Sequence, residues 1–482
     1  MNHNISTLVQ EKTVLLHKKL NEQKPENPPV QIEPSEGNYS ITNIPPSGLT
    51  LSSPGTYVLS QDVEWTPDFI FVTAITITAS GITLDLNEKT ITAKGDLKDF
   101  CVGIKVTHGN YPVYDTKIEH GTLSEFGYCG VSAVKAYNLT IEKVTVEKLS
   151  YSTFDVLPSG FFLDQCNSFN INYCHVQECS VTAMLGAGFL IMNSVQGALY
   201  DCHVHNFTNK DGVAAGFTYN GCSYINTSSC HVNTLQTLYG GNPDSTIGHT
   251  CIGFMPTDST HLQFYNCKAG TILGCCDDCH GMSLFTVNTV TVQGFQALGV
   301  HDGLGPQKTG AKATGLEVYG DNINISDCLV QDITAIVPQD LQSTGFSACG
   351  TLITFNNCRA KNVQVLNDDP QPKPDTQYGY GTGFGWAPDP RPQFVKPAAY
   401  VTYENCIAED CQLGYDTWNH QNSTWKDVTY SGTGIEHLIE PNGTERIYKM
   451  NFCSELPNSN ALSPSKDFPI YNCVFNNTYP GW

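Results

Sequence analysis

The sequence predicts an all-β solenoid in which short parallel strands stack turn upon turn. The tripeptide Cys-His-Val returns every 28 residues, at Cys174, Cys202 and Cys230. A Gly-Phe pair stands fourteen residues before each of these cysteines. Within each copy, apolar and polar residues alternate with the period of two that is typical of strands, and helical periodicity is absent.

The repeat extends over most of the 482 residues. A repeat with strand-like content indicates a solenoid, because one unit cannot bury its apolar face alone. We count about a dozen copies, beginning at Gly81, Gly103, Gly130, Gly160, Gly188, Gly216, Gly253, Gly281, Gly315, Gly345, Gly383 and Gly414.

Equivalent positions of successive copies are expected to form columns, because parallel strands lie about 4.8 Å apart. In "LYDCHVHNF", Cys202 and Val204 share one face and His203 the other. We therefore expect Cys174, Cys202 and Cys230 to form an interior ladder. Side chains aligned in register rarely offer the torsion of a disulfide, so free thiols and a reducing assembly compartment are predicted.

Three stretches resemble the rungs of a known family: "GTYVLS", "AITITASGITLDLNEKTITA" and "YNCVFNN". They are similar to right-handed parallel β-helix proteins of the pectate-lyase superfamily, over roughly residues 50 to 430. The resemblance implies a right-handed parallel β-helix of about a dozen rungs. It implies no single activity, since that fold carries lyases, hydrolases, epimerases, phage tailspikes and non-catalytic adhesins.

The two ends differ from the repeat, which divides the chain into four segments. Residues 1–36 are predicted to hold an N-terminal helix and a Pro-rich linker, residues 37–80 an N-terminal cap and the first strands, residues 81–430 the β-helix, and residues 431–482 a C-terminal cap. Over residues 4–22 a short helix would present Ile5, Leu8, Val9, Leu15, Leu16 and Leu20. We expect this helix to dock on a partner, self or foreign, or to cover the first rung.

Charge and hydropathy limit the partners. With 46 acidic and 25 basic residues, the net charge of -21 repels nucleic acid and anionic lipid. The longest apolar run, 69–79, is about half the length of a membrane span. Charged residues interrupt the first 19 positions, so no signal peptide is predicted. We expect a virion or cell surface, reached by lysis or a non-classical route, rather than the cytoplasm. A homo-oligomer or docking to a particle through residues 4–22 is a further expectation.

Insertions enter the repeat at one corner. The step from the cysteine position to the next glycine is 14 residues in regular copies, but 23 after Cys230, 20 after Phe295 and 25 after Cys358. Loops on one flank of a repeat protein often bind ligands. Aromatic rings stack on sugars, and carboxylates accept hydrogen bonds from hydroxyl groups. We therefore predict a polysaccharide or glycan partner, bound by Tyr239, Asp244, Tyr378, Tyr380, Trp386, Asp389, Arg391 and Trp418.

The catalytic motifs of the superfamily are not matched. The Asn-Thr-Asp of polygalacturonases, the arginine setting of pectate lyases and the Tyr-Gly-x-Asp-Pro-His-Asp of alginate epimerases are all missing. Tailspike hydrolases share no short motif, so spaced carboxylates stay candidates: Asp277, Asp278 and Asp302, with His301. Cleavage by a hydrolase or lyase is left open, and the alternative is a non-catalytic structural or attachment protein such as a virion component.

Two patterns suggest metals and fall short. His175, His203 and His231 are expected to stack on a flat outer face without convergent geometry. The stretch "CCDDCH" lacks the second ligand pair of a structural zinc site. We predict no metal site and no cofactor, with calcium kept open because pectate lyases bind it through aspartates.

Overall fold

The structure is a computed structural model, and it describes residues 30–32, 38–151, 157–238, 249–275, 278–303, 312–337, 343–367, 381–385, 398–411, 413–415, 420–421, 424–432, 437–439, 445–447, 470–471 and 474–477. The chain divides into two compact units. Unit 1 comprises residues 1–248 and 256–262, and unit 2 comprises residues 249–255 and 263–482.

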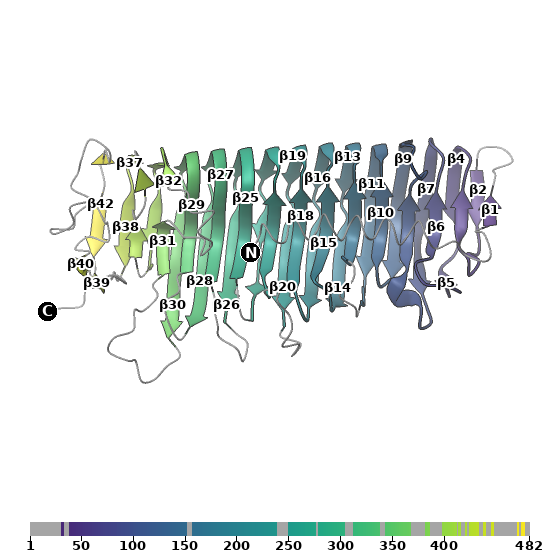
Figure 1. The fold of residues 1–482 in the computed structure, drawn as a ribbon, viewed down its shortest axis with the longest axis horizontal. Helices are drawn as coiled ribbons and strands as arrows, with labels where there is room; N and C mark the ends of the chain where they lie inside the picture. Colours follow the sequence, from purple (N-terminus) through teal and green to yellow (C-terminus); the bar gives the residue numbers. More distant parts are fainter. Residues whose placement is uncertain are drawn as a thin grey trace. The chain divides into compact units, whose positions relative to one another are not determined.

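Unit 1 is a solenoid of parallel strands, seen side by side in Figure 1. Its first sheet contains, in order of pairing, β1 (Val30–Ile32), β3 (Leu49–Leu51), β6 (Thr73–Ile77), β8 (Val102–Val106), β10 (Cys129–Val134), β12 (Ser159–Asp164), β15 (Leu185–Met192) and β18 (Val213–Asn220).

Two further sheets complete each turn of unit 1. The second contains β2 (Asn38–Ile41), β4 (Gly55–Leu59), β13 (Asn167–Asn172), β16 (Val195–Tyr200) and β19 (Ser223–Ser228). The third contains β5 (Val63–Trp65), β14 (His175–Val181), β17 (His203–Asn209) and β20 (His231–Thr237). Three long strands contribute to both sheets: β7 (Ile82–Ala93), β9 (Val113–Ser124) and β11 (Ala136–Glu147). A single 3-10 turn, η1 (Lys98–Phe100), is found among the described residues of this unit.

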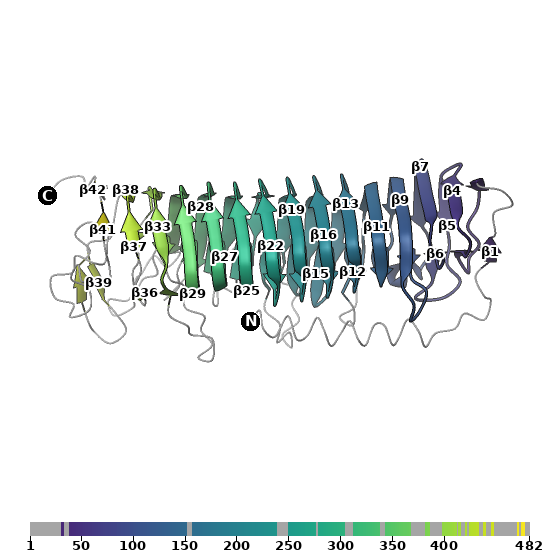
Figure 2. The same ribbon diagram turned by 90° about the horizontal axis from the view of Figure 1, so that it is seen from above.

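Unit 2 is also built of parallel strands (Figure 2). Three long strands pair in register: β25 (Asp278–Gln293), β27 (Lys312–Ser326) and β29 (Ser343–Asn356). Their pairing is continued by β31 (Gly381–Gly385), β32 (Ala398–Ala399), β33 (Thr402–Glu404), β35 (Leu413–Tyr415), β36 (His420–Gln421), β37 (Thr424–Lys426) and β41 (Ile470–Tyr471).

The other sheet of unit 2 contains β23 (Lys268–Ala269), β24 (Ile272–Leu273), β26 (Gln296–Asp302), β28 (Leu329–Val337), β30 (Arg359–Asn367), β34 (Ile407–Glu409), β38 (Thr429–Gly432) and β42 (Val474–Asn477). Strands β21 (Cys251–Thr257) and β22 (Thr260–Tyr265) contain residues of both units. In the C-terminal region, β39 (His437–Ile439) and β40 (Glu445–Ile447) pair antiparallel.

The parallel β-helix prediction is confirmed by this pairing. The predicted helix over residues 4–22 lies outside the described residues. So does most of the predicted C-terminal cap, although β41 and β42 continue the parallel pairing through residue 477. Among the described residues, no helix has the length and apolar character needed to cross a membrane.

Columns of identical side chains fill the interior, as predicted. Cys174, Cys202 and Cys230 are fully buried, and the thiol of Cys202 contacts the thiols of both neighbours. All 17 cysteines of the described residues are buried, and none of them forms a disulfide with another described cysteine. Burial raises the pKa of the Cys166 and Cys222 thiols to about 12, so these thiols stay protonated and unreactive.

The Gly-Phe unit acts through two columns. The rings of Phe161, Phe189 and Phe217 stack with centroids 4.7 Å apart and planes within 4° of parallel. At the preceding glycine, a Cβ on Gly188 would lie 2.3 Å from Cγ2 of Val204. The glycine therefore lets the opposite wall approach, and the phenylalanine fills the space beyond it.

The outer faces carry columns as well. His175, His203 and His231 are register partners, with ring centroids 5.0 Å and 4.9 Å apart. This ladder lies on the face opposite the cysteine ladder, as period two predicts.

Removing a ring from the aromatic column tests the packing. We expect Phe189→Ala to destabilise the chain by about 3–5 kcal/mol, because the cavity sits between two stacked rings. The measurement is the free energy of unfolding in denaturant. Tyr200→Ala is the control, since Tyr200 is 44% exposed, and its effect should stay below about 1 kcal/mol. Equal effects of the two changes would contradict the stacked column.

Candidate functional site

The outer face of β25, β27 and β29 in unit 2 is polar and yet buried. The ring of Phe346 meets the ring of Phe355 at 5.7 Å, so Phe346 points into the solenoid. The next residue in each strand points outward, and these register partners are Ser283, Glu317 and Ser347. None is more than 2% exposed. We call this surface the polar outer face.

A buried ion pair lies at its centre. The Lys312 ammonium is bound to Oε1 of Glu317, and Oγ of Ser283 donates to Oε2 of Glu317 at 3.1 Å. Nδ1 of His280 lies 3.5 Å from the same Oε2. His280 and Glu317 are each 2% exposed, so bulk water screens these contacts little.

The environment sets the charge states of this group. Burial alone would raise the pKa of Glu317, but Lys312 and, to a smaller extent, His280 hold the pKa of that carboxyl down at about 2. Burial also lowers the pKa of His280, against the attraction of Glu317. His280 is therefore neutral near pH 7, and Lys312 is the cation that keeps Glu317 ionised.

A column of hydroxyl groups runs beside the ion pair. Thr314, Thr344 and Thr382 are register partners that continue the position of His280, and none is more than 3% exposed. Their Oγ1 atoms have no hydrogen-bond partner among the described residues. An unsatisfied buried hydroxyl costs about 1–3 kcal/mol, so this column destabilises the strands unless it is satisfied from outside the described residues.

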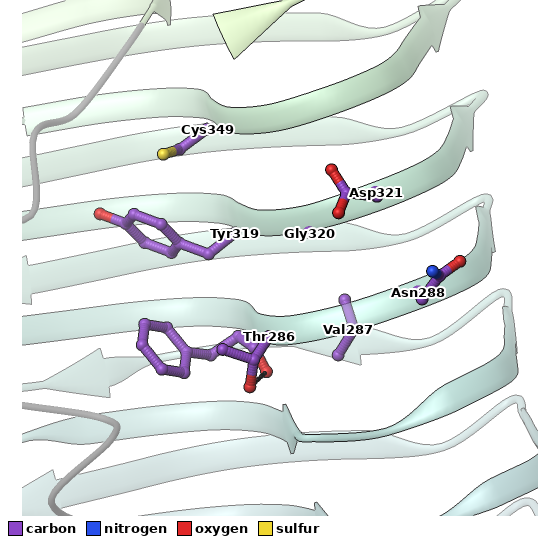
Figure 3. Close-up of a pocket in the computed structure, with 8 residues that line it drawn as sticks. Thr286, Val287, Asn288, Tyr319, Gly320, Asp321 and Cys349 are labelled. Carbon is purple, nitrogen blue, oxygen red and sulfur yellow. Dashed lines mark hydrogen bonds between the residues drawn. The ribbon is translucent and has the colours of Figure 1, made fainter. Parts of the chain in front are cut away.

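A pocket of about 270 Å³ lies two residues further along the same strands. Its wall is apolar where Phe285 and Tyr319 meet, with ring centroids 5.4 Å apart, and where Cys349 follows. Figure 3 shows Asn288 and Asp321 on the other side of the strand bend. Oδ1 of Asp321 accepts hydrogen bonds from the backbone N–H of Thr351 at 2.9 Å and from its hydroxyl at 2.5 Å.

An irregularity in the strands forms this pocket. The register of β25 on β27 shifts between Phe285 and Val287, where Thr286 takes a φ of 51°. On the next turn Gly350 has a φ of 132°, and a Cβ there would lie 1.9 Å from the carbonyl oxygen of Gly320. The bulge and the close glycine contact bend the sheet and leave space that side chains do not fill.

The predicted insertions adjoin the polar outer face in sequence. Two of the three long steps fall between β26 and β27 and between β30 and β31, directly before two strands of the hydroxyl column, and the third falls between β20 and β21. The predicted substrate-binding residues lie outside the described residues: Tyr239, Asp244, Tyr378, Tyr380, Trp386, Asp389, Arg391 and Trp418.

The predicted catalytic residues take different positions. Asp277 lies outside the described residues, and Asp278 opens β25 opposite Lys312. Asp302 is fully buried, and its carboxylate accepts from the backbone N–H groups of Gly303 at 2.8 Å and Lys312 at 2.9 Å. His301 is half-buried and is the neighbour of Asp302 in β26, so strand alternation places the two side chains on opposite faces.

Sequence reasoning missed Glu317, Lys312 and Tyr319 as site residues. The signal was present in "GLEVYG", where a carboxylate interrupts an apolar strand. In the equivalent strands of unit 1 the same outward position, one residue after the stacked phenylalanine, holds Phe162 and Leu190.

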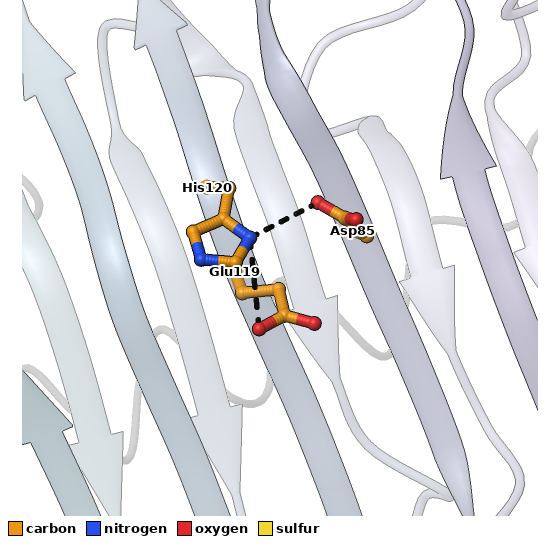
Figure 4. Close-up of side chains that lie close together, drawn as sticks. All are labelled: Asp85, Glu119 and His120. Atoms are coloured by element: carbon orange, nitrogen blue, oxygen red, sulfur yellow. Dashed lines mark ion pairs between the residues drawn. The ribbon is translucent and has the colours of Figure 1, made fainter.

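A second cluster lies in unit 1. Ligand atoms of Asp85, Glu119 and His120 all lie within 4.8 Å of one another (Figure 4). Nζ of Lys117 sits 2.5 Å from Oε2 of Glu119, so an ammonium already neutralises this carboxylate. Calcium favours six to eight oxygen ligands, a set that two carboxylates and an imidazole do not approach.

No family model matches the sequence, and no curated protein matches it. The chain is similar to several solved structures, among them an epimerase module, an adhesin and a tailspike. The A-module of the mannuronan C-5 epimerase AlgE6 of Azotobacter vinelandii is 11% identical, with 78% of this chain and 91% of that chain covered and a TM-score of 0.37. The surface adhesin PfbA of Streptococcus pneumoniae is 9% identical, with 89% and 88% covered and a TM-score of 0.38.

Tailspike protein 3 of bacteriophage CBA120 is 11% identical, with 88% of this chain and 56% of that chain covered and a TM-score of 0.34. These similarities are all weak, and they carry no argument about the site or the activity of this chain.

The buried ion pair can be tested by a double-mutant cycle. We expect Glu317→Gln alone to destabilise the chain by about 3–5 kcal/mol, because it leaves the Lys312 ammonium without its counterion. Adding Lys312→Met to Glu317→Gln should recover at least half of this loss in the free energy of unfolding. Additive effects of the two changes would show that the groups do not interact.

The lowered pKa of Glu317 also predicts a pH dependence. A carboxyl whose pKa falls from 4.5 unfolded to about 2 folded stabilises the chain fully above pH 4.5 and loses that contribution as the pH falls toward 2. The difference in unfolding free energy between the unmodified chain and Glu317→Gln should therefore be constant from pH 7 to pH 5 and shrink below. A difference that stays constant down to pH 3 would contradict this assignment.

Proposed function

We propose that this chain binds a polysaccharide at the pocket that lies on the outside of β25, β27 and β29, beside the buried polar outer face. The observation that carries the proposal is the pocket between Phe285, Tyr319 and Asp321, which continues the ion pair and the hydroxyl column on the same face. Two of the predicted loops, with their aromatic and acidic residues, directly precede β27 and β31 in the sequence. A glycan chain would contact the pocket and the loops together.

The lining suits an uncharged sugar ring. A pyranose offers apolar C–H faces and a rim of hydroxyl groups, and the pocket offers aromatic carbon on one side and amide and carboxylate oxygens on the other. Oδ1 of Asp321 is already engaged by Thr351, so a sugar hydroxyl would donate to Oδ2. The net charge of -21 disfavours a polyanionic glycan.

Binding without cleavage fits the described side chains better than hydrolysis. Glycoside hydrolysis needs a general acid. Glu317 is held ionised by Lys312, Asp302 is engaged by two backbone N–H groups, and His280 is neutral. Of the predicted catalytic carboxyls, Asp277 and Asp278 are the two whose role as a proton donor is to be tested. Cleavage is therefore the second candidate function, to be tested through these two residues.

The setting that fits this function is an outer surface. We propose that the chain is a structural or attachment component of a cell surface or virion, with homo-oligomerisation or particle docking as the way it is held there. The sugar site as described needs no cofactor. Calcium is the one ion worth titrating into a binding assay, because loop carboxylates such as Asp244 and Asp389 are available in the sequence.

A glycan array, followed by calorimetry on each hit, tests the proposal. Asp321→Asn and Tyr319→Ala should each weaken binding of a neutral polysaccharide by about tenfold or more, since one hydrogen bond or ring contact contributes about 1–1.5 kcal/mol. Tyr200→Ala in unit 1 is the control and should bind normally. Absence of any glycan hit, or equal affinity of all variants, would overturn the assigned site.

The same glycan, incubated with the chain, separates binding from cleavage. We expect no release of reducing ends above background. If release occurs, Asp277→Asn or Asp278→Asn should abolish it while leaving binding intact. Release that survives both substitutions would show that other residues carry the chemistry.

A further inference from the structure

The first sheet of unit 1 has an outer face that is buried although it points away from the core. The Tyr219 hydroxyl meets Oγ1 of Thr227 at 2.7 Å, which places Tyr219 inside the solenoid. Its neighbour Thr218 therefore points outward, together with the register partners Phe162 and Leu190. These three residues are 1%, 3% and 0% exposed.

The buried area extends over several turns. The outward positions three residues earlier hold Ser159, Ala187 and Ala215, and none is more than 1% exposed. Toward the start of the sheet, the same column as Leu190 continues to Lys105 in β8, and burial lowers the pKa of that lysine. A strip of mixed character thus runs along the outside of β8, β10, β12, β15 and β18, with Lys105, Ser132 and Thr218 at its two ends and the apolar Phe162 and Leu190 between them.

The described elements do not account for this cover. Strand β15 contacts β12 and β18 within its sheet and β17 behind it. Residues outside the described ranges are therefore candidates for the cover. In unit 1 these are 1–29, 33–37, 152–156 and 239–248. Residues 1–29 form the longest of these segments.

The sequence of that segment matches the strip. At about 100° per residue, a helix over residues 4–22 gathers Ile5, Leu8, Val9, Leu15, Leu16 and Leu20 on one side, with Lys12 and Lys19 among them. The strip carries a carboxylate as well as the Lys105 ammonium: Asp164 points outward, is 1% exposed, and accepts hydrogen bonds from the side-chain amides of Gln165 and Asn193.

The length of the predicted helix and the place where the segment joins the sheet also fit this surface. Nineteen residues of helix span about 28 Å, and five strands span about 19 Å. The segment ends at β1, the first strand of the same sheet, three strands before β8. The three steps measure about 14 Å, and residues 23–29 reach at most about 25 Å.

We propose that the outer face of β8, β10, β12, β15 and β18 is a docking surface for an amphipathic helix, and that residues 4–22 of the same chain occupy it. The segment folds back from β1 across the stacked strands and ties five turns together from outside. This interaction is independent of the proposed polysaccharide site, which lies in unit 2.

Hydrogen exchange with mass spectrometry on the full chain tests this interaction. Amides of residues 5–20 should exchange at least tenfold more slowly than in a synthetic peptide of residues 1–24. The double substitution Leu8→Glu/Leu16→Glu should bring their exchange within about twofold of the peptide and increase bis-ANS fluorescence. The matched control Gln10→Glu/Asn21→Glu changes the opposite side of the helix and should leave the protection in place.

A change on the sheet completes the test. Leu190→Glu should abolish the protection of residues 5–20, and if this variant fails to fold, the double substitution in the segment decides alone. Peptide-like exchange in the unmodified chain, or protection that survives Leu8→Glu/Leu16→Glu, would overturn the proposal. Protection that disappears on twentyfold dilution would show that the segment comes from a second copy, which overturns docking within one chain.

Discussion

Register between successive turns is the constraint on which the rest of the structure depends. Each strand hydrogen-bonds to the same position one turn later, so a side chain is always followed by its equivalent at strand spacing. The stacked rings of Phe161, Phe189 and Phe217 show how closely this is kept. A slip by one residue would exchange the inner and outer faces of a strand. The apolar contacts with the strands of the turns before and after it would then be lost. The core and the outer columns are therefore specified together.

The same constraint explains how one backbone carries two different surfaces. The outward position that follows the inward aromatic or aliphatic column holds Phe162 and Leu190 in unit 1 and Glu317 in unit 2. Both kinds of side chain are buried, but their energetic consequences differ. Apolar side chains are stabilised by any apolar cover. A buried carboxylate is tolerated only with a counter-ion, which Lys312 supplies from the start of the same strand. The cost of this arrangement in stability is consistent with a retained functional role.

Much of the fold could be predicted from the sequence, because columns leave periodic traces. The cysteine and histidine ladders follow from a 28-residue repeat and strand alternation, and the structure has both. Alternation separates inward from outward positions but treats every outward position as solvated. It therefore gave no reason to single out Glu317. Asp302 is a catalytic candidate from the sequence only as one of several spaced carboxylates, and in the structure its carboxylate accepts hydrogen bonds from two backbone N–H groups. Such contacts depend on how the chain turns, which no repeat encodes.

The role of the cysteines can be assigned only once their positions in the columns are known. In a short secreted chain, many cysteines indicate a disulfide framework. Here the described cysteines stack as small apolar residues, and burial raises the pKa of thiols such as Cys166 and Cys411 to about 12. A thiol that is neither ionised nor accessible cannot take part in exchange. In the part of the chain that the structure describes, the solenoid is therefore held by packing and by hydrogen bonds between turns, with no disulfide between described cysteines.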